Sequence, residues 1–157
     1  MSAGQSLFLP FSPGPGQAGD FGYMDCGLFD LREAGLAARA AAARLVSIVQ
    51  DVRTLVGQTL VGFSTLQVPG QAGPQRLGLV IGAEKVALQE RADVVLQVQA
   101  PGTFHGDSGM LWPTASGQAA AIHARGQEMA GLAGSPLTTA MAASRAAKAL
   151  GVQLLLG

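Results

Sequence analysis

The sequence is short of charge, of aromatic residues and of the residue types that bind metals. Only 13% of its 157 residues are charged and the formal net charge is zero, so the chain lacks the positive field that attracts the phosphates of nucleic acids. A single cysteine, Cys26, allows no internal disulfide and favours the cytoplasm over an oxidising compartment. Two histidines and one cysteine, scattered along the chain, lack the spacing of a zinc site. We therefore expect no metal and no other cofactor.

Long hydrophobic runs are also missing. No uninterrupted apolar stretch reaches the ~18 residues of a membrane helix, and no basic residue precedes the short run at residues 7–9, so we expect neither a membrane partner nor a signal peptide. What the chain has instead is 48% hydrophobic residues and 22 glycines. This apolar content excludes a disordered chain, and the length suits one domain with its own core. A surface with so few charges must be apolar somewhere.

The chain divides into three regions by composition. Residues 1–32 are irregular, with prolines and glycines over 10–22 and then a short apolar run. Residues 33–51 are rich in alanine, which predicts a connecting helix. Residues 52–157 contain short β-branched or apolar runs at regular spacing, which predict an antiparallel barrel or sandwich, not a parallel α/β sheet. The runs lie at residues 60–66, 77–81, 94–98, 110–112 and 118–124.

A helix is predicted at the end of the chain. Ser135 suits the N-cap, Pro136 the first helical position, and Gly151 the residue after the last turn. The apolar positions that would face the core are Leu137, Met141, Ala147 and Leu150.

The sequence Gly106-Asp107-Ser108-Gly109 is the one motif that carries chemistry. A serine between glycines in a tight turn presents its hydroxyl outward, and the N–H groups of Gly106 and Ser108 can bind a developing oxyanion. Glycine leaves room there for a carbonyl substrate. The four residues alone are equally compatible with a purely structural turn.

The context of this turn resembles the C-terminal barrel of the chymotrypsin/trypsin-like serine peptidases. The turn is followed by an apolar strand, then by Ala121-Ile122-His123-Ala124-Arg125-Gly126 as a second strand, then by a helix. The resemblance implies a mainly β fold: a trypsin-like antiparallel barrel with an incomplete first barrel, a connecting helix and a C-terminal helix. It implies a serine endopeptidase-like activity on peptide or protein substrates. Ser108 would be the nucleophile, with Gly106 and Ser108 forming the oxyanion hole.

The resemblance also assigns an acid and a substrate site. Asp25, in the stretch Asp25-Cys26-Gly27-Leu28-Phe29, matches the segment of the catalytic aspartate, with glycine in place of alanine. Its separation from Ser108 is close to the roughly 90 residues of the family's triad. The strand Ala124, Arg125 and Gly126 would pair with the substrate backbone. The remaining substrate-binding residues would be Gly102, Thr103, Phe104 and His105.

Two positions bear on specificity and on the stability of the turn. Gly102 stands where trypsin-like enzymes carry the acid that selects a basic side chain, so no preference for Arg or Lys is expected. Asp107 would be buried and paired, and its partner is not evident, because the family's new N-terminal amine has no equivalent at this N-terminus. An unpaired buried carboxylate would be costly.

The chain departs from the family at the histidine of the triad. That residue precedes the aspartate by roughly 45 residues in the triad template, whereas no histidine precedes Asp25 here. The first barrel would be almost wholly missing, so activity would need a second chain or a missing N-terminal barrel. His105 shares the turn of Ser108, and His123 is expected to be a satisfied or partly buried histidine and not the general base. The G-x-S-x-G elbow of α/β-hydrolases does not fit, because Met110 occupies its last position.

Two alternatives stay open. The chain could be a catalytically inactive peptidase-like barrel that binds a peptide or protein along the strand that ends at Gly126. It could also be a small all-β domain in which the Ser108 turn has only a structural role. In either peptidase-like case, a face that normally packs against a first barrel would leave apolar side chains exposed beside Asp25 and Ser108.

Overall fold

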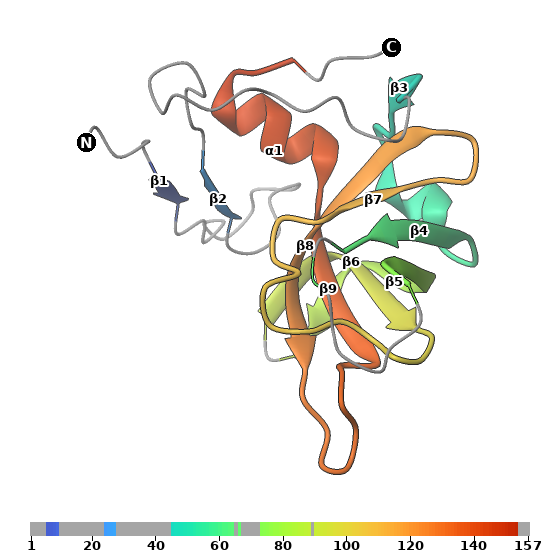
Figure 1. Cartoon of the computed structure of the whole chain (residues 1–157). Coiled ribbons are helices and arrows are strands. Elements are labelled where there is room, and N and C mark those ends of the chain that lie inside the picture. The colour runs from blue at the N-terminus through green and yellow to red at the C-terminus, as the bar shows by residue number, and fades with distance from the viewer. Residues whose placement is uncertain are drawn as a thin grey trace.

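The chain folds around one curled sheet (Figure 1), seen in a computed structural model that describes residues 6–9, 24–27, 45–64, 66, 73–88 and 90–153. The strands of this sheet run in the order β3-β8-β9-β6-β5-β4, with β7 paired to β8. They are β3 (Ser47–Ile48), β4 (Thr59–Phe63), β5 (Gln75–Ala87), β6 (Glu90–Val98), β7 (Leu111–Pro113), β8 (Gln118–Gln127) and β9 (Leu137–Ala142). These strands pair antiparallel except for the short pair β3–β8, which is parallel. The predicted mainly β fold is therefore confirmed.

The ends of the sheet approach each other. An isolated antiparallel bridge joins Leu60 of β4 to Thr114, directly after β7, so the sheet curls back on itself (Figure 1). Bulges interrupt the ladders between Val80 and Gly82 in β5 and between His123 and Arg125 in β8. A bulge bends its strand and redirects the neighbouring side chain.

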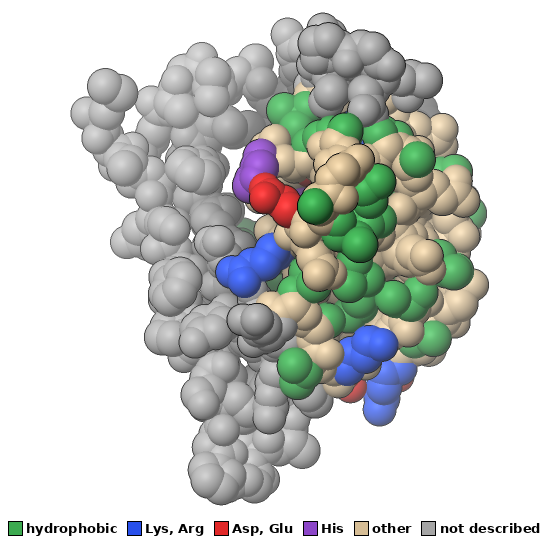
Figure 2. Space-filling view, turned by 90° about the horizontal axis from the view of Figure 1, so that it is seen from below, with side chains coloured by type: hydrophobic (Ala, Val, Ile, Leu, Met, Phe, Trp, Pro, Cys, Tyr) green, Lys and Arg blue, Asp and Glu red, His purple; other side chains and the backbone are tan. Residues whose placement is uncertain are grey.

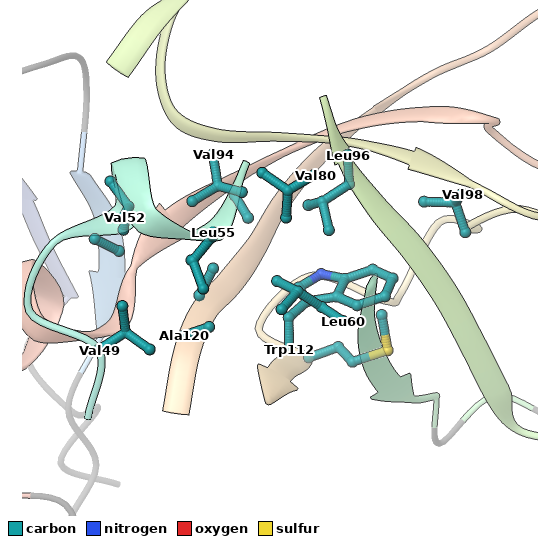
Figure 3. Close-up of a cluster of buried hydrophobic side chains, with 14 residues drawn as sticks. Val49, Val52, Leu55, Leu60, Val80, Val94, Leu96, Val98, Trp112 and Ala120 are labelled. Carbon is teal, nitrogen blue, oxygen red and sulfur yellow. The ribbon is translucent and has the colours of Figure 1, made fainter. Parts of the chain in front are cut away.

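The core fills the inside of this curled sheet (Figure 3). Trp112 is its largest buried side chain. A Cβ at Gly62 would lie 3.1 Å from the indole, and one at Gly78 would lie 3.2 Å from it. Glycine at these two strand positions therefore leaves the space that the Trp112 ring fills. The buried aliphatic side chains around the ring include Leu55, Leu60, Val80, Val94 and Leu96.

The end of the chain differs from the prediction. The helix α1 is Ala143–Leu150, and the predicted first turns at Ser135 and Pro136 instead lead into β9. β9 pairs with β6 on one side and β8 on the other, so two ladders override the local helix-start signal. Leu137 and Met141 accordingly lie in a strand. Gly151 ends the helix as predicted: its φ is +64°, and the N–H groups of Gly151 and Val152 bond back in a Schellman motif.

The N-terminal third is described only in part. β1 (Ser6–Leu9) and β2 (Met24–Gly27) form an antiparallel pair, and β2 contacts α1 (Figure 1). Of the predicted connecting helix over 33–51, residues 33–44 lie outside the described residues. Residues 45–51 are not helical, and the short 3₁₀ helix Val52–Leu55 follows them.

Candidate functional site

The Ser108 turn lies between β6 and β7 and presents the serine to solvent. The N–H of Asp107 donates to the Phe104 carbonyl over 3.0 Å, which closes a tight turn. Gly106 and Gly109 have φ of +99° and +85°, a region in which glycine carries no Cβ penalty. The Ser108 side chain is exposed, as the motif predicts.

The turn leaves two backbone amides without a carbonyl partner. The N–H groups of Asp107, Gly109 and Met110 each donate to a backbone carbonyl. Within the described ranges, those of Gly106 and Ser108 donate to none. These are the two amides that the motif assigns to an oxyanion hole, and free N–H groups on a glycine-rich turn are a suitable anion site.

The Asp107 carboxylate anchors the turn from below. Asp107 is 2% exposed. Its Oδ1 accepts a 2.5 Å hydrogen bond from the Ser64 hydroxyl, and its Oδ2 accepts one of 2.9 Å from the Phe104 N–H. Ser64 Oγ also accepts from the Leu66 N–H over 3.0 Å. The resemblance implied that the Asp107 carboxylate is buried and paired but did not indicate its partners. The structure identifies two of them as the Ser64 hydroxyl and the Phe104 N–H.

Arg76 provides the counter-charge to this carboxylate. Its Nε lies 4.0 Å from Asp107 Oδ2, and the two side chains are 1% and 0% exposed. Its Nη1 donates to the carbonyls of Gly73 and Gln75, and its Cζ lies 5.5 Å from the centre of the Phe104 ring. Within the described residues, Nε has no hydrogen-bond partner, so the contact with Asp107 is electrostatic at this distance.

Sequence reasoning missed both Ser64 and Arg76. Arg76 lies two residues before the buried Gly78 and four before the buried Val80 in β5. Residues at this spacing share one face of a strand, so Arg76 occupies an inward-facing position. An arginine at such a position needs a buried acid, and this was the available signal.

A pocket of about 530 Å³ opens beside Ser108. Ser108 is part of its lining, together with six of the seven residues predicted to bind substrate. Those six are Thr103, Phe104, His105, Ala124, Arg125 and Gly126. The segment between β8 and β9 forms the opposite wall, with residues 128–130 and 132–134.

Gly102 is the predicted substrate-binding residue that does not line this pocket. It is buried and has φ of +85°, and a Cβ there would lie 2.7 Å from the Ser135 carbonyl oxygen. Gly102 lines a separate cavity of about 280 Å³ with Pro101 and Leu132. Glycine is therefore required at position 102 for a structural reason, because a side chain would collide with the backbone of Ser135.

A smaller hollow of about 200 Å³ lies against the Ser108 turn, lined by Phe63 and residues 106–110. Phe63 is 51% exposed, which places an apolar ring beside the serine. Further exposed apolar side chains include Leu79, Ile81, Met129 and Leu132. Figure 2 shows how hydrophobic and uncharged atoms dominate one described face, with few charged side chains among them.

Within the described part of the chain, neither histidine is hydrogen-bonded to the Ser108 hydroxyl. His105 is exposed, and its Nε2 bonds to the exposed carboxylate of Glu128. His123 is 3% exposed, and its Nδ1 lies 3.0 Å from the Thr138 hydroxyl. Burial lowers the pKa of His123, and the nearby Asp107 carboxylate opposes this shift. The prediction of a satisfied or partly buried His123 is confirmed, and the side chain is almost fully buried.

Asp25 lies in β2, where its backbone is paired with Phe8 of β1. Its side chain lies outside the described residues. The described contacts therefore bring together Ser108, the two free amides and the predicted pocket, while the relation of the Asp25 carboxylate to Ser108 stays a prediction.

No family model, no curated protein and no solved structure matches the chain. Among the residues that the structure describes, no three His, Cys, Asp or Glu side chains gather as a metal site. No helix in the described ranges is long and apolar enough to cross a membrane.

Proposed function

We propose that this chain is a serine-peptidase-like domain that binds an extended peptide beside Ser108, with Ser108 as the nucleophile. The observation that carries the proposal is the turn itself. An exposed serine stands at the rim of a 530 Å³ pocket, next to two amides that have no partner among the described residues, on a turn held from below by a buried carboxylate. A merely structural turn needs neither the free amides nor the adjoining pocket.

The peptide would lie along β8. On the β7 side, the pairing of β8 stops at His123 in the described part of the chain, where His123 exchanges hydrogen bonds with Gly109 and Met110. The strand continues to Gln127 along the edge of the pocket. An extended peptide can add to such an edge through backbone hydrogen bonds while one of its side chains enters the pocket.

In the proposed reaction, Ser108 Oγ attacks the scissile carbonyl and gives its proton to a general base. The carbonyl oxygen becomes an oxyanion that accepts from the Gly106 and Ser108 N–H groups. The leaving amine takes the proton, and water then hydrolyses the acyl-serine and restores the hydroxyl. Asp25 is the proposed orienting acid, and a trypsin-like barrel is the proposed architecture.

The general base is the part that the described residues do not supply. His105 bonds to Glu128 and His123 to Thr138. These are the two histidines of the sequence, so we infer that the general-base histidine comes from further sequence or from a second chain that covers the apolar surface beside Phe63.

A fluorophosphonate probe tests the nucleophile directly. Attack by Ser108 Oγ on phosphorus would expel fluoride and leave a phosphonylated serine, which peptide mass spectrometry locates. We expect labelling at Ser108 and its loss in Ser108→Ala. Ser116→Ala is the matched control, because Ser116 is also exposed but its hydroxyl bonds to Thr114. A folded chain that is labelled at Ser108 neither alone nor in a cell extract that can supply the general base would contradict the nucleophile.

A second candidate is a catalytically inactive peptide-binding module. It is favoured by one observation: within the described residues, the Ser108 hydroxyl bonds to neither imidazole. This module would bind peptides along β8 with the same affinity in Ser108→Ala as in the unaltered chain, and would show no phosphonylation. The peptidase-like proposal predicts both binding and labelling.

A further inference from the structure

The two histidines of the sequence differ in whether a second chain can reach them. The His105 side chain is 94% exposed, whereas His123 is 3% exposed and bonded to Thr138. Within the described part of one chain, His105 is not hydrogen-bonded to Ser108. A second copy of the chain would bring a second His105 that approaches Ser108 from outside.

The imidazole of His105 is held by an acid. An ionised carboxylate only accepts hydrogen bonds, so His105 Nε2, which is bonded to Glu128 Oε1, carries a hydrogen. In the neutral ring Nδ1 therefore holds the lone pair, and no described residue donates to it. A carboxylate that orients an imidazole whose other nitrogen can accept a proton is the arrangement of a general base.

The outward-facing positions of β4 and β5 form an uncharged surface, which we call the Phe63 face. Val61 lies opposite Leu77, so side chains of the two strands adjoin. Phe63, Leu79 and Ile81 remain 51%, 40% and 39% exposed, and a contiguous exposed apolar patch marks an interaction site. The Phe63 face comprises Thr59, Val61, Phe63, Gln75, Leu77, Leu79 and Ile81.

The charge of the chain suits association with an identical copy. The formal net charge is zero, so two copies do not repel each other as a whole. The Phe63 face carries no charged side chain that would select a partner of opposite charge. A second, equally apolar copy of the same face complements it.

The Phe63 face adjoins the serine turn. Phe63 lines the hollow of about 200 Å³ together with residues 106–110. His105 lies three residues before Ser108, so their Cα atoms are about 11 Å apart at most. In a two-fold dimer, each contact occurs twice with the copies exchanged. An axis that crosses this turn therefore brings His105 of each copy toward Ser108 of the other.

We propose that two copies of this chain pair through the Phe63 face and that His105 of each copy is the general base for Ser108 of the other. The inference rests on the proposed function, because it names the second chain that Ser108 needs. His105 Nδ1 takes the proton of Ser108 Oγ as this oxygen attacks the carbonyl carbon, and then gives the proton to the leaving amine. Glu128 is a positioning residue that holds the imidazole.

Sedimentation velocity of the full chain tests the pairing, at the concentration used for fluorophosphonate labelling. We expect a dimer for the unaltered chain and a monomer for Phe63→Glu, with Leu79→Glu as the second variant of the same face. Val86→Glu is the matched control, because Val86 is 68% exposed in β5 but lies outside the Phe63 face, and it should stay dimeric. A monomeric unaltered chain, or a dimer that both face variants leave intact, would overturn the proposal.

Mixing two inactive variants tests the shared site. Ser108→Ala keeps the base but lacks the nucleophile, and His105→Gln keeps the nucleophile but lacks the base, which should slow its labelling at least about 100-fold. In an equal mixture about half of the dimers contain one copy of each and have one complete site, so about a quarter of the labelling of the unaltered chain should return. The label should lie on the His105→Gln copy. Full labelling of His105→Gln alone, or no recovery in the mixture, would overturn the proposal.

Glu128→Ala tests the positioning role. We expect labelling of Ser108 to slow roughly 10-fold, and the fraction of His105 that is protonated at Nε2 to fall in two-bond ¹H–¹⁵N spectra of the same sample at pH 8. The variant should remain a dimer, since Glu128 lies outside the Phe63 face. An unchanged labelling rate and an unchanged tautomer would contradict this role of Glu128.

The outcomes separate this inference from the proposed function. Ser108 labelled only in a cell extract, or labelled equally in the monomeric Phe63→Glu, would uphold the nucleophile and overturn the second copy as the source of the base. A dimer that is labelled neither alone nor in an extract would overturn the nucleophile and with it the shared site.

Discussion

Arg76 Nε lies 4.0 Å from Asp107 Oδ2 in the interior of the protein, and both side chains are excluded from solvent. The distance is too long for a hydrogen bond, while the opposite charges still balance in a medium of low polarity. The Ser108 turn is therefore supported by groups from β5 and from the end of β4, within the described part of the same chain. This support needs no amine released at the N-terminus.

Asp107→Asn should destabilise the protein strongly. The substitution removes the counter-charge of a buried guanidinium and one acceptor of the Ser64 or Phe104 bond, which costs about 3 kcal/mol or more. Urea denaturation at pH 7.5 gives the free energy of unfolding. Asp51→Asn is the control, because Asp51 also pairs with an arginine but does so at the surface, so we expect only a small change. An Asp107→Asn protein of unchanged stability and unchanged amide shifts at residues 106–109 would rule out the anchoring role.

A double-mutant cycle isolates the pair from its surroundings. Arg76→Met alone leaves the Asp107 carboxylate buried without a counter-charge, whereas Arg76→Met with Asp107→Asn leaves no buried charge. We expect the double variant to be more stable than the sum of the two single changes predicts, by at least about 1 kcal/mol. Strict additivity would show that Arg76 and Asp107 do not sense each other at 4.0 Å.

The free energy of unfolding should decrease as the pH is lowered, because of His123. Its pKa in the folded protein is lowered by burial from the usual 6.5, so the unfolded chain takes up the proton first as the pH decreases. The unfolded state then binds more protons, and the free energy of unfolding declines below about pH 6.5 by up to about 1.4 kcal/mol per pH unit, until the folded ring also titrates.

Denaturation at pH 7.5 and pH 5.5 measures this decline. The charged and titratable groups around His123 are Asp107, Arg125, Glu128 and His105. His123→Gln should reduce the decline. Equal slopes in the unaltered chain and in His123→Gln would contradict a buried, neutral His123.

Gly102 and Gly131 have nearly the same φ, +85° and +83°, but different surroundings. A Cβ at Gly102 would lie 2.7 Å from the Ser135 carbonyl oxygen, and one at Gly131 would meet nothing within 4 Å. We expect Gly131→Ala to cost about 1 kcal/mol through backbone strain alone. Gly102→Ala should cost roughly 2 kcal/mol more. Thermal unfolding of both variants gives the comparison, and equal costs would show that Gly102 has no steric role.

The sequence was most informative where local pattern and tertiary structure agree. The short runs around residues 60–63, 77–80 and 94–98 form strands as predicted. The first two alternate in burial, and the third is buried except at Gln97. The Ser108 turn was predicted from its four-residue motif, and the substrate-binding residues were implied by the resemblance to serine peptidases; six of those seven residues line one pocket with Ser108.

Long-range pairing is what the sequence could not provide. Leu137–Ala142 follows a helix-start signal, yet it becomes a strand because β6 and β8 flank it. The partnership of Asp107 with Ser64 joins positions 43 residues apart, and the orientation of His123 depends on a hydroxyl of β9. None of these contacts leaves a periodic pattern in the sequence.

The segment between β8 and β9 can vary in sequence with little effect on the core. It connects two adjacent antiparallel strands whose register is fixed by their own ladder, and it forms one wall of the pocket with residues 128–130 and 132–134. Insertions or replacements in this hairpin would reshape what the pocket accepts while the core around Trp112 stays intact. If the pocket binds a peptide as proposed, its ligand preference could change by variation of this hairpin, without a new scaffold.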